Sequence, residues 1–284
     1  MSRFAYVSGR YLRQAAATVP IEDRGYQFGD GVYEVIAVHG GRLVDRDLHL
    51  QRLERSLREA RIAKPVSDIV LTMILDRVRA LNRIDSGIVY LQITRGVAPR
   101  DHTFPGRVDP QLVVTARRAK PVDPALLEHG AAVITIPDER WARCDIKSIS
   151  LLANVLGKQR AREAGALEAW QIDREGLVTE GTTSNAWIVT GAGEIVTRPA
   201  GHAILNGVTR LVVLQIARES GLDFVERAFS PDEAMSAREA FLTSTTSLVV
   251  PVTKLDGVSI GDGRPGPVTR ELRSRLLQHL DRLS

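Results

Sequence analysis

One lysine of this chain stands in a setting suited to covalent chemistry with a carbonyl group. The chain has five lysines, and four of them fall in loops or polar stretches where solvent is expected: Lys64, Lys120, Lys158 and Lys254. Lys147 differs, because apolar Ile146 and Ile149 surround it and a predicted helix follows. A lysine forms a Schiff base as the neutral amine, which a protected apolar setting favours. Lys147 is therefore the candidate nucleophile, with an ordinary surface charge as the alternative.

Two stretches carry donors suited to an anion such as phosphate. A predicted helix opens at residues 207–209, directly after a flexible glycine. The free N–H groups and the dipole of a helix start favour negative charge there. The alternative is an ordinary helix start capped by Asn206. Residues 243–247 are five consecutive hydroxyl side chains, which could donate to phosphate or form the polar end of a strand.

Further charged side chains could bind a cofactor or a substrate. Glu180 could hold a protonated ring nitrogen in a cofactor pocket, or lie on an exposed hairpin. Arg100 and His102 lie in a loop bounded by glycine and proline. An arginine fork suits a carboxylate, and the alternative is a solvated loop. Arg52 follows His49 by three residues on a predicted helix, where arginine more often pairs at the surface.

Composition excludes several other classes of protein. The net charge is only +4, with 25% charged residues and no clustered basic face, so no nucleic-acid partner is expected. The six histidines lack zinc-site spacing, and no metal is expected. The single cysteine, Cys144, excludes an intrachain disulfide and favours a reducing compartment. The sequence shows neither a signal-peptide core nor a run of about 20 apolar residues, so we expect a cytoplasmic protein without a membrane span.

The elements that position these residues fall into two halves. A linker is predicted at residues 119–125, which contain two prolines, between an N-terminal α/β domain (1–118) and a C-terminal α/β domain (126–284). Periodicity and turn residues predict the elements of the first half. They are a hairpin around Ser8-Gly9, two strands around residues 39–41, a helix from Asp45 or Asp47 to about Arg61, a helix over 67–81, and strands at 87–96 and 111–118.

The second half shows a different order of elements. It contains a strand at 131–137, a helix over 148–164, hairpins within 168–181 and 184–198, a helix from about 208 that stops at Gly221, and a terminal helix from about Pro267. A short helix near 230–237 and a strand near 237–244 stand between the last two helices. The mixture of helices and strands predicts an α/β (α+β) fold.

Five segments resemble signatures of the D-amino-acid transaminases, a group within the fold-type IV pyridoxal-phosphate enzymes. In chain order they are residues 22–34, 140–148, 179–185, 205–210 and 243–247. Several short motifs in the right order over nearly the whole chain are more specific than any one of them. The resemblance implies two α/β domains with pyridoxal 5'-phosphate between them.

The resemblance also implies roles for the residues that meet the cofactor. Lys147 would form the Schiff base and carry a proton between the substrate Cα and the cofactor C4′. Glu180 would pair with the pyridine nitrogen, and Leu205 would pack against the ring. The cofactor-binding set around the phosphate would be Arg52, Gly207, the amides of Val208 and Thr209, Ser244 and Thr245.

The substrate side of the site follows from the same resemblance. Tyr33, with Arg100 and His102 of the partner subunit, would bind the substrate carboxylate, which implies a homodimer with a shared active site. The reaction implied moves an amino group from a D-amino acid such as D-alanine to a 2-oxo acid such as 2-oxoglutarate or pyruvate. The pattern Arg100-x-His102-x-Phe104 resembles the substrate loop of this group more than that of the branched-chain L-amino-acid enzymes. It also argues against aminodeoxychorismate lyases and against amine transaminases that need no carboxylate trap. A fold-type IV (R)-amine transaminase or branched-chain L-amino-acid transaminase is the main alternative, and a noncatalytic cofactor-binding protein is the other.

Overall fold

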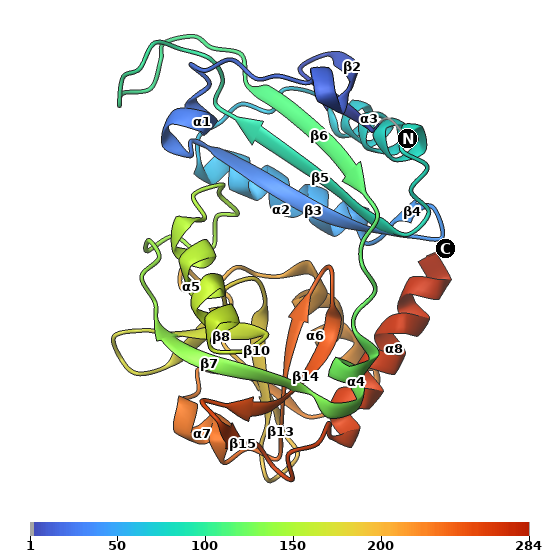
Figure 1. Cartoon of the computed structure of the whole chain (residues 1–284), viewed down its shortest axis with the longest axis vertical. Coiled ribbons are helices and arrows are strands. Elements are labelled where there is room, and N and C mark those ends of the chain that lie inside the picture. The colour runs from blue at the N-terminus through green and yellow to red at the C-terminus, as the bar shows by residue number, and fades with distance from the viewer. Residues whose placement is uncertain (1–2, 284) are drawn as a thin grey trace. The chain divides into compact units, whose positions relative to one another are not determined.

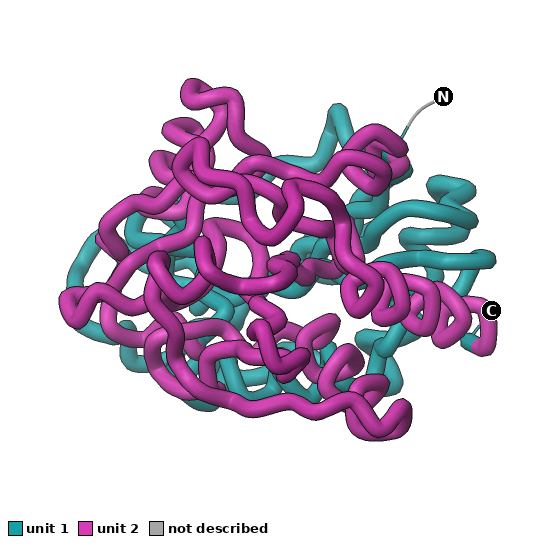
Figure 2. Tube along the Cα trace, turned by 90° about the horizontal axis from the view of Figure 1, so that it is seen from below, with its two compact units in different colours: residues 1–120, 146–151, 283–284 teal, residues 121–145, 152–282 magenta. Residues whose placement is uncertain are grey.

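The computed structural model describes residues 3–283 and divides them into two compact units (Figure 2). Unit 1 contains the described residues up to Lys120, the segment Ile146–Leu151 and Leu283. Unit 2 contains Pro121–Asp145 and Leu152–Arg282. The chain thus leaves unit 1 after Lys120, inside the predicted linker at 119–125, and returns to it for the short segment that carries Lys147. The sequence did not predict this return.

Unit 1 is built on a six-stranded antiparallel sheet in the order β2-β1-β6-β5-β3-β4 (Figure 1). Its strands are β1 (Phe4–Val7), β2 (Arg10–Arg13), β3 (Gly31–His39), β4 (Arg42–Leu43), β5 (Gly87–Thr94) and β6 (Gln111–Arg117). The predicted hairpin at Ser8-Gly9 is confirmed, since both residues have positive φ angles between β1 and β2. The turn at Gly40-Gly41 between β3 and β4 is confirmed in the same way.

Helices cover this sheet and supply the core of unit 1. They are α2 (Arg46–Glu59) and α3 (Asp68–Leu81). Unit 1 also contains the short helix α1 (Arg24–Phe28), which adds no residue to this core, and a 3-10 turn at Gln14–Ala16. The helix α2 packs against β3, and α3 packs against β6 and β1 (Figure 1). Leucines at helical spacing, such as Leu53 and Leu57 of α2, enter the core with alternate residues of β3. Both long helices were predicted, and Ser67 caps α3 by accepting from the Val70 N–H at 3.4 Å.

Unit 2 is built on a nine-stranded mixed sheet. Its path is β12-β11-β10-β13-β14-β7-β8-β9, and β15 pairs with β14. The predicted antiparallel hairpins β8–β9 and β10–β11 are confirmed. Fully buried Trp170, Trp187, Phe229 and Phe241 fill much of the interior. The strands are β7 (Ala131–Pro137), β8 (Glu168–Ile172), β9 (Val178–Gly181), β10 (Asn185–Val189), β11 (Ile195–Thr197), β12 (Phe224–Glu226), β13 (Glu239–Ser244), β14 (Leu248–Leu255) and β15 (Val258–Ser259).

The helices of unit 2 are α4 (Pro124–His129), α5 (Leu152–Glu163), α6 (Val208–Glu219), α7 (Pro231–Met235) and α8 (Pro267–Leu283). The helix predicted over 148–164 was wrong at its start, because Ser148 pairs with Val32 of β3 and the helix begins only at Leu152. The helix α4 begins inside the predicted linker. Pro124 suits a first helical position because no intrahelical partner is needed there, and Asp123 accepts from the Ala125 N–H at 3.0 Å.

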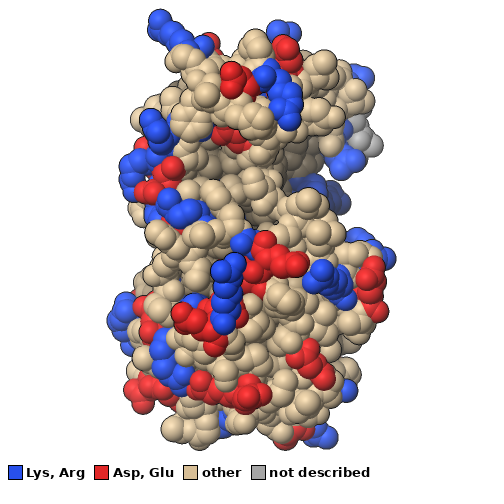
Figure 3. Space-filling view, turned by 90° about the vertical axis from the view of Figure 1, so that its left-hand side faces the viewer, with Lys and Arg blue, Asp and Glu red and all other residues tan. Residues whose placement is uncertain are grey.

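Two further observations concern the apolar character of the helices and the charge of the surface. Among residues 3–283, no helix combines the length and the apolar character needed to cross a bilayer. On the face shown in Figure 3, basic and acidic side chains intermix over the surface.

Candidate active site

The segment around Lys147 is held against β3 by its backbone. The Tyr33 N–H donates to the Lys147 carbonyl at 3.0 Å, and the Ile149 N–H donates to the Gly31 carbonyl at 3.1 Å. In addition, the Lys147 N–H donates to the Ser56 hydroxyl of α2 at 3.3 Å. The backbone of Lys147 is therefore fixed by two elements of unit 1, so that its side chain starts from a defined position.

The side chain of Lys147 meets Tyr33, which was predicted as a substrate-binding residue. The Lys147 Nζ lies 4.2 Å from the centroid of the Tyr33 ring. Both residues are half-buried. An aromatic face within about 6 Å attracts an ammonium group. The structure thus brings together two of the residues singled out from the sequence, one candidate nucleophile and one candidate substrate contact.

Arg52, a predicted phosphate-binding residue, is fixed by a buried carboxylate that the sequence did not single out. Glu34 is fully buried, and it accepts from Arg52 Nε at 2.7 Å and from Arg52 Nη2 at 2.8 Å. Glu34 also accepts from His49 Nδ1 at 2.8 Å. This position belongs to the row of β3 that faces the core, where a charge needs partners. The signal in the sequence was an acidic residue in an apolar alternating strand.

The electrostatics of this cluster follow from its geometry. Burial alone would raise the pKa of Glu34, but the charge and hydrogen bonds of Arg52 and the hydrogen bond from His49 outweigh it and lower the pKa to about 2. Burial lowers the pKa of His49, more than Glu34 raises it. At neutral pH, Glu34 is therefore an anion, and His49 is a neutral donor at Nδ1. The charged Glu34 gives Arg52 a bidentate anchor.

Arg100 and His102 lie in the exposed loop between β5 and β6, as predicted. Both contact the ring of Phe28, with Arg100 Cζ at 4.7 Å from its centroid and the His102 ring centroid at 5.4 Å. A guanidinium and an imidazole on one aromatic support form a surface that suits a carboxylate. The structure brings these two predicted residues together on Phe28.

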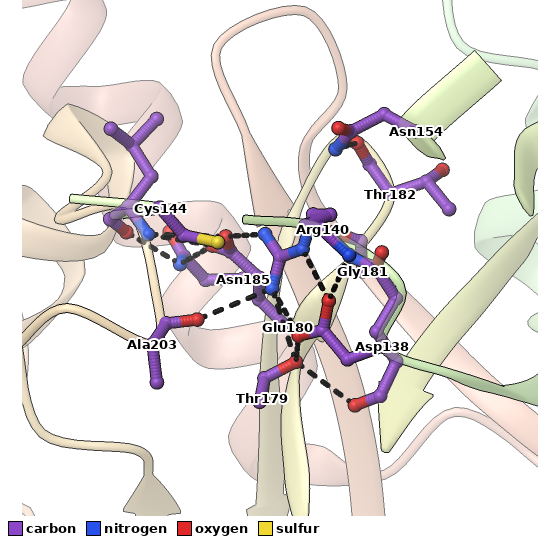
Figure 4. Close-up of polar contacts among 12 residues, drawn as sticks. Asp138, Arg140, Cys144, Asn154, Thr179, Glu180, Gly181, Thr182, Asn185 and Ala203 are labelled. Atoms are coloured by element: carbon purple, nitrogen blue, oxygen red, sulfur yellow. Dashed lines mark hydrogen bonds and ion pairs between the residues drawn. The ribbon is translucent and has the colours of Figure 1, made fainter. Parts of the chain in front are cut away.

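In unit 2, Glu180 is the centre of a buried polar network (Figure 4). The Leu205 N–H donates to both of its carboxylate oxygens, at 3.1 Å each. The Asn185 amide donates to it at 3.0 Å, and Arg140 forms an ion pair with it. The alternative of an exposed hairpin carboxylate is therefore wrong. Leu205, the predicted ring contact, is joined to Glu180 directly.

Arg140 is one residue of this network to which sequence reasoning assigned no role. Besides Glu180, it donates to Asp138 Oδ2 at 2.7 Å, to the Thr179 hydroxyl at 3.2 Å and to the Ala203 carbonyl at 3.2 Å. Burial alone would lower the pKa of Arg140, but its acidic partners Asp138 and Glu180 outweigh it and raise the pKa. Arg140 stays charged and holds Glu180 in one orientation. The signal for Arg140 in the sequence was its place in the segment 140–148, which resembles a signature of the D-amino-acid transaminases.

The predicted anion site at the start of α6 has a glycine as its N-cap residue. Gly207 occupies that position, and it has no side chain that could cap the helix. Asn206 is therefore not the N-cap, and that alternative is wrong; its Oδ1 accepts from Arg210 Nη1 at 3.1 Å. A Cβ at Gly207 would lie 2.2 Å from Asn185 Oδ1. The first turn, with Val208 and Thr209, can thus offer N–H donors to an anion.

The hydroxyl run lies at the turn between β13 and β14. Thr243 is buried and accepts from Trp187 Nε1 at 2.9 Å, so it belongs to the core. Ser244 ends β13, and its hydroxyl oxygen accepts from the Ser247 N–H at 3.2 Å, which closes the turn. Ser244 and Thr245 are half-buried. Part of the hydroxyl run is thus the end of β13. Ser244 and Thr245, the two predicted phosphate contacts, lie where the chain passes from β13 into the turn.

Comparisons with known proteins add to this geometry. The amino-transferase class IV family matches residues 31–255. The D-alanine aminotransferase of Bacillus licheniformis is 46% identical over 270 residues, which cover 95% of this chain and 94% of that protein. The D-alanine aminotransferase of Staphylococcus aureus (strain MSSA476) is 40% identical over 278 residues, which cover 97% of each.

A solved structure shares the fold. The branched-chain amino acid aminotransferase from Escherichia coli has a TM-score of 0.89 at 23% identity, with 98% of this chain and 94% of that chain covered. This similarity concerns the fold alone, and it confirms the predicted two-domain α/β architecture. Because the family match covers most of the chain and the relatives align over nearly all of it, this protein belongs to the amino-transferase class IV family.

Proposed function

We propose that this protein is a pyridoxal-phosphate-dependent transaminase that moves the amino group of a D-amino acid such as D-alanine to a 2-oxo acid such as 2-oxoglutarate or pyruvate. The observation that carries the proposal is the 46% identity to a D-alanine aminotransferase over 95% of the chain. The placement of Lys147 against Tyr33, and of Arg52 against Glu34, supports it.

The groups present suit the phosphate of the cofactor. We assign Arg52, the N–H groups of Val208 and Thr209, and the hydroxyls of Ser244 and Thr245 to the phosphate. Gly207 contributes by the lack of a side chain, since a Cβ there would collide with Asn185. The Arg52 guanidinium, which Glu34 holds in place, suits an anion. The start of α6 suits an anion as well, because no side chain caps the helix at Gly207.

The groups around Glu180 suit the pyridine ring. When bound, pyridoxal phosphate supplies an electron-withdrawing ring that takes up the charge left by the substrate Cα proton. We assign Glu180 to the ring nitrogen, where its negative charge would hold a proton. Arg140 and Asn185 keep that carboxylate oriented. Leu205 would pack against the ring.

Lys147 would do two tasks. Its amine would hold the cofactor covalently and would then, once displaced by the substrate amine, take the proton from the substrate Cα and deliver it to C4′. The backbone anchors on Tyr33 and Ser56 limit where Nζ reaches. A proton carrier that acts at two neighbouring atoms needs such a fixed origin.

The substrate carboxylate would be bound by Tyr33 together with the Arg100 and His102 side chains of a second copy of this chain. This makes a homodimer part of the proposal, because each active site would then need both copies. We also propose a cytoplasmic location, which is compatible with a chain that has a single cysteine.

The test is a half-reaction followed by visible absorption. D-Alanine, L-alanine, L-leucine and (R)-1-phenylethylamine are added separately to the protein loaded with pyridoxal phosphate, with no 2-oxo acid. We expect D-alanine to convert the cofactor band to that of the pyridoxamine form, and the L-amino acids to leave it unchanged. Conversion by L-leucine or by the amine, but not by D-alanine, would overturn the substrate assignment.

The second candidate is a branched-chain L-amino-acid transaminase, the class of enzyme to which the Escherichia coli neighbour of the same fold belongs. Its identity to this chain is 23%, against 46% for the D-alanine aminotransferase of Bacillus licheniformis. The same half-reaction separates the two candidates, since L-leucine would then be the active donor.

A further inference from the structure

A partly buried carboxylate, Asp30, links the loop of Arg100 and His102 to the body of unit 1. The Asp30 side chain is 15% exposed and lies between α1 and β3. It accepts from Arg24 Nε at 2.8 Å, from Arg95 Nε at 2.7 Å and from Arg95 Nη2 at 3.0 Å. Two arginines that are 4% and 9% exposed thus share one anion.

Each of these arginines also contacts the loop that carries Arg100 and His102. Arg24 Nη1 donates to the Asp101 carbonyl at 2.6 Å, between the two proposed carboxylate-binding residues. The Arg95 guanidinium lies 3.7 Å from the centroid of the Phe104 ring. The loop is therefore held at positions 101 and 104 by side chains that Asp30 fixes.

Phe28 connects the same network to Arg100 and His102. The guanidinium of Arg24 lies 4.8 Å from the Phe28 centroid, and Arg100 lies 4.7 Å from it. His102 packs on the same ring. A shift of Arg24 would therefore disturb both the backbone at Asp101 and the aromatic support.

Charge and burial make Asp30 the centre of this arrangement. Arg95 also donates to the carbonyls of Ala60 and Arg61 at 2.8 and 2.7 Å, which fixes it to the end of α2. Removing the Asp30 charge would leave two little-exposed arginines without the anion that they share. Hydrogen bonds with an ionised donor or acceptor are about twice as strong as those between neutral groups, and in the bonds to Asp30 both partners are ionised.

We propose that Asp30 is a positioning residue for the loop at 100–104, and that it sets the affinity for the substrate carboxylate without touching it. This inference rests on the proposed function, because that function assigns the carboxylate to Arg100 and His102.

The test compares Asp30→Asn with Asp68→Asn, a matched change at a surface carboxylate that pairs with Lys64. Hydrogen exchange of residues 98–107 is measured first. We expect faster exchange in Asp30→Asn only. In steady-state kinetics, we expect an increase of about tenfold in KM for D-alanine with kcat changed by less than about twofold. The visible cofactor band should stay unchanged.

A second variant guards against a folding failure. Phe104→Leu removes the aromatic face from Arg95 at a residue that is 50% exposed. It should raise KM by about two- to fivefold, as the loss of the contact with Arg95 implies. The Arg61 guanidinium, 5.4 Å from the centroid of the same ring, loses its aromatic contact as well. Folded variants with wild-type loop exchange and wild-type KM would overturn the inference.

Arg100→Ala separates this inference from the proposed function. If Arg100→Ala leaves KM for D-alanine unchanged, the carboxylate role assigned to the loop is wrong, and the exchange data alone decide whether Asp30 holds the loop. If Arg100→Ala raises KM and Asp30→Asn does not, the positioning role of Asp30 is wrong.

Discussion

Replacing Glu34 by glutamine should destabilise the protein, because it removes one buried negative charge. Glu34 is fully buried and binds Arg52 with both oxygens and His49 with one. The substitution keeps the shape of the side chain and removes its charge. Arg52 would then have a neutral partner at a side chain that is only 10% exposed.

The size of the effect follows from the pKa of Glu34. Its value falls from 4.5 to about 2 in the folded protein, which corresponds to about 3 kcal/mol, since each tenfold change in proton affinity is worth about 1.4 kcal/mol. The folded pKa lies below the unfolded one. The stabilisation is therefore fully present above about pH 4.5 and is lost as the pH falls through about 2.

The assay is urea unfolding of both proteins, followed by circular dichroism, near neutral pH and at several pH values between 4.5 and 2. We expect Glu34→Gln to be less stable by about 3 kcal/mol near neutral pH, with a difference that shrinks across that interval. Asp68→Asn serves as the surface control. Equal stabilities near neutral pH, or a difference that does not depend on pH, would refute the reasoning.

Three further outcomes are expected. Gly207→Ala should weaken pyridoxal phosphate binding by about tenfold or more, because the new Cβ would lie 2.2 Å from Asn185 Oδ1; a spectroscopic titration measures it, and wild-type affinity would contradict it. Cys144 should react with a thiol reagent about 100-fold more slowly than free cysteine near pH 8, because burial, the largest cause, raises its pKa to about 11; equal rates would argue against this. Burial lowers the pKa of His49, so the stability of the folded protein should decline as the pH falls below 6.5, the ordinary pKa of histidine. His49→Gln should remove that part of the pH dependence of unfolding. An unchanged profile would show that His49 does not titrate in this way.

Local patterns in the sequence were enough for most elements. The Ser8-Gly9 turn and the start of α3 at Ser67 are set by residues next to them in the chain, and both were predicted. The long helix α6 was also predicted, since its apolar spacing extends over three turns. Such features depend on neighbours within a few residues, which a sequence shows directly.

Long-range pairing could not be predicted in the same way. Residues 148–151 continue the helical spacing of α5, but Ile149 donates to Gly31 and Ser148 pairs with Val32, so this segment follows β3 instead. Those partners are far away in the sequence. The same limit applies to the pairs Glu34–Arg52 and Glu180–Arg140, because neither burial nor a distant partner is visible in a local pattern. The resemblance supplied the roles of the site residues, which still stand as proposals.

The most direct test of the central claim is to locate the lysine that carries the cofactor. The protein loaded with pyridoxal phosphate is reduced with borohydride, digested, and analysed by mass spectrometry. We predict a phosphopyridoxyl group on the peptide that contains Lys147, and none on peptides with the other four lysines. A stoichiometric adduct on Lys64, Lys120, Lys158 or Lys254, with Lys147 unmodified, would contradict the account.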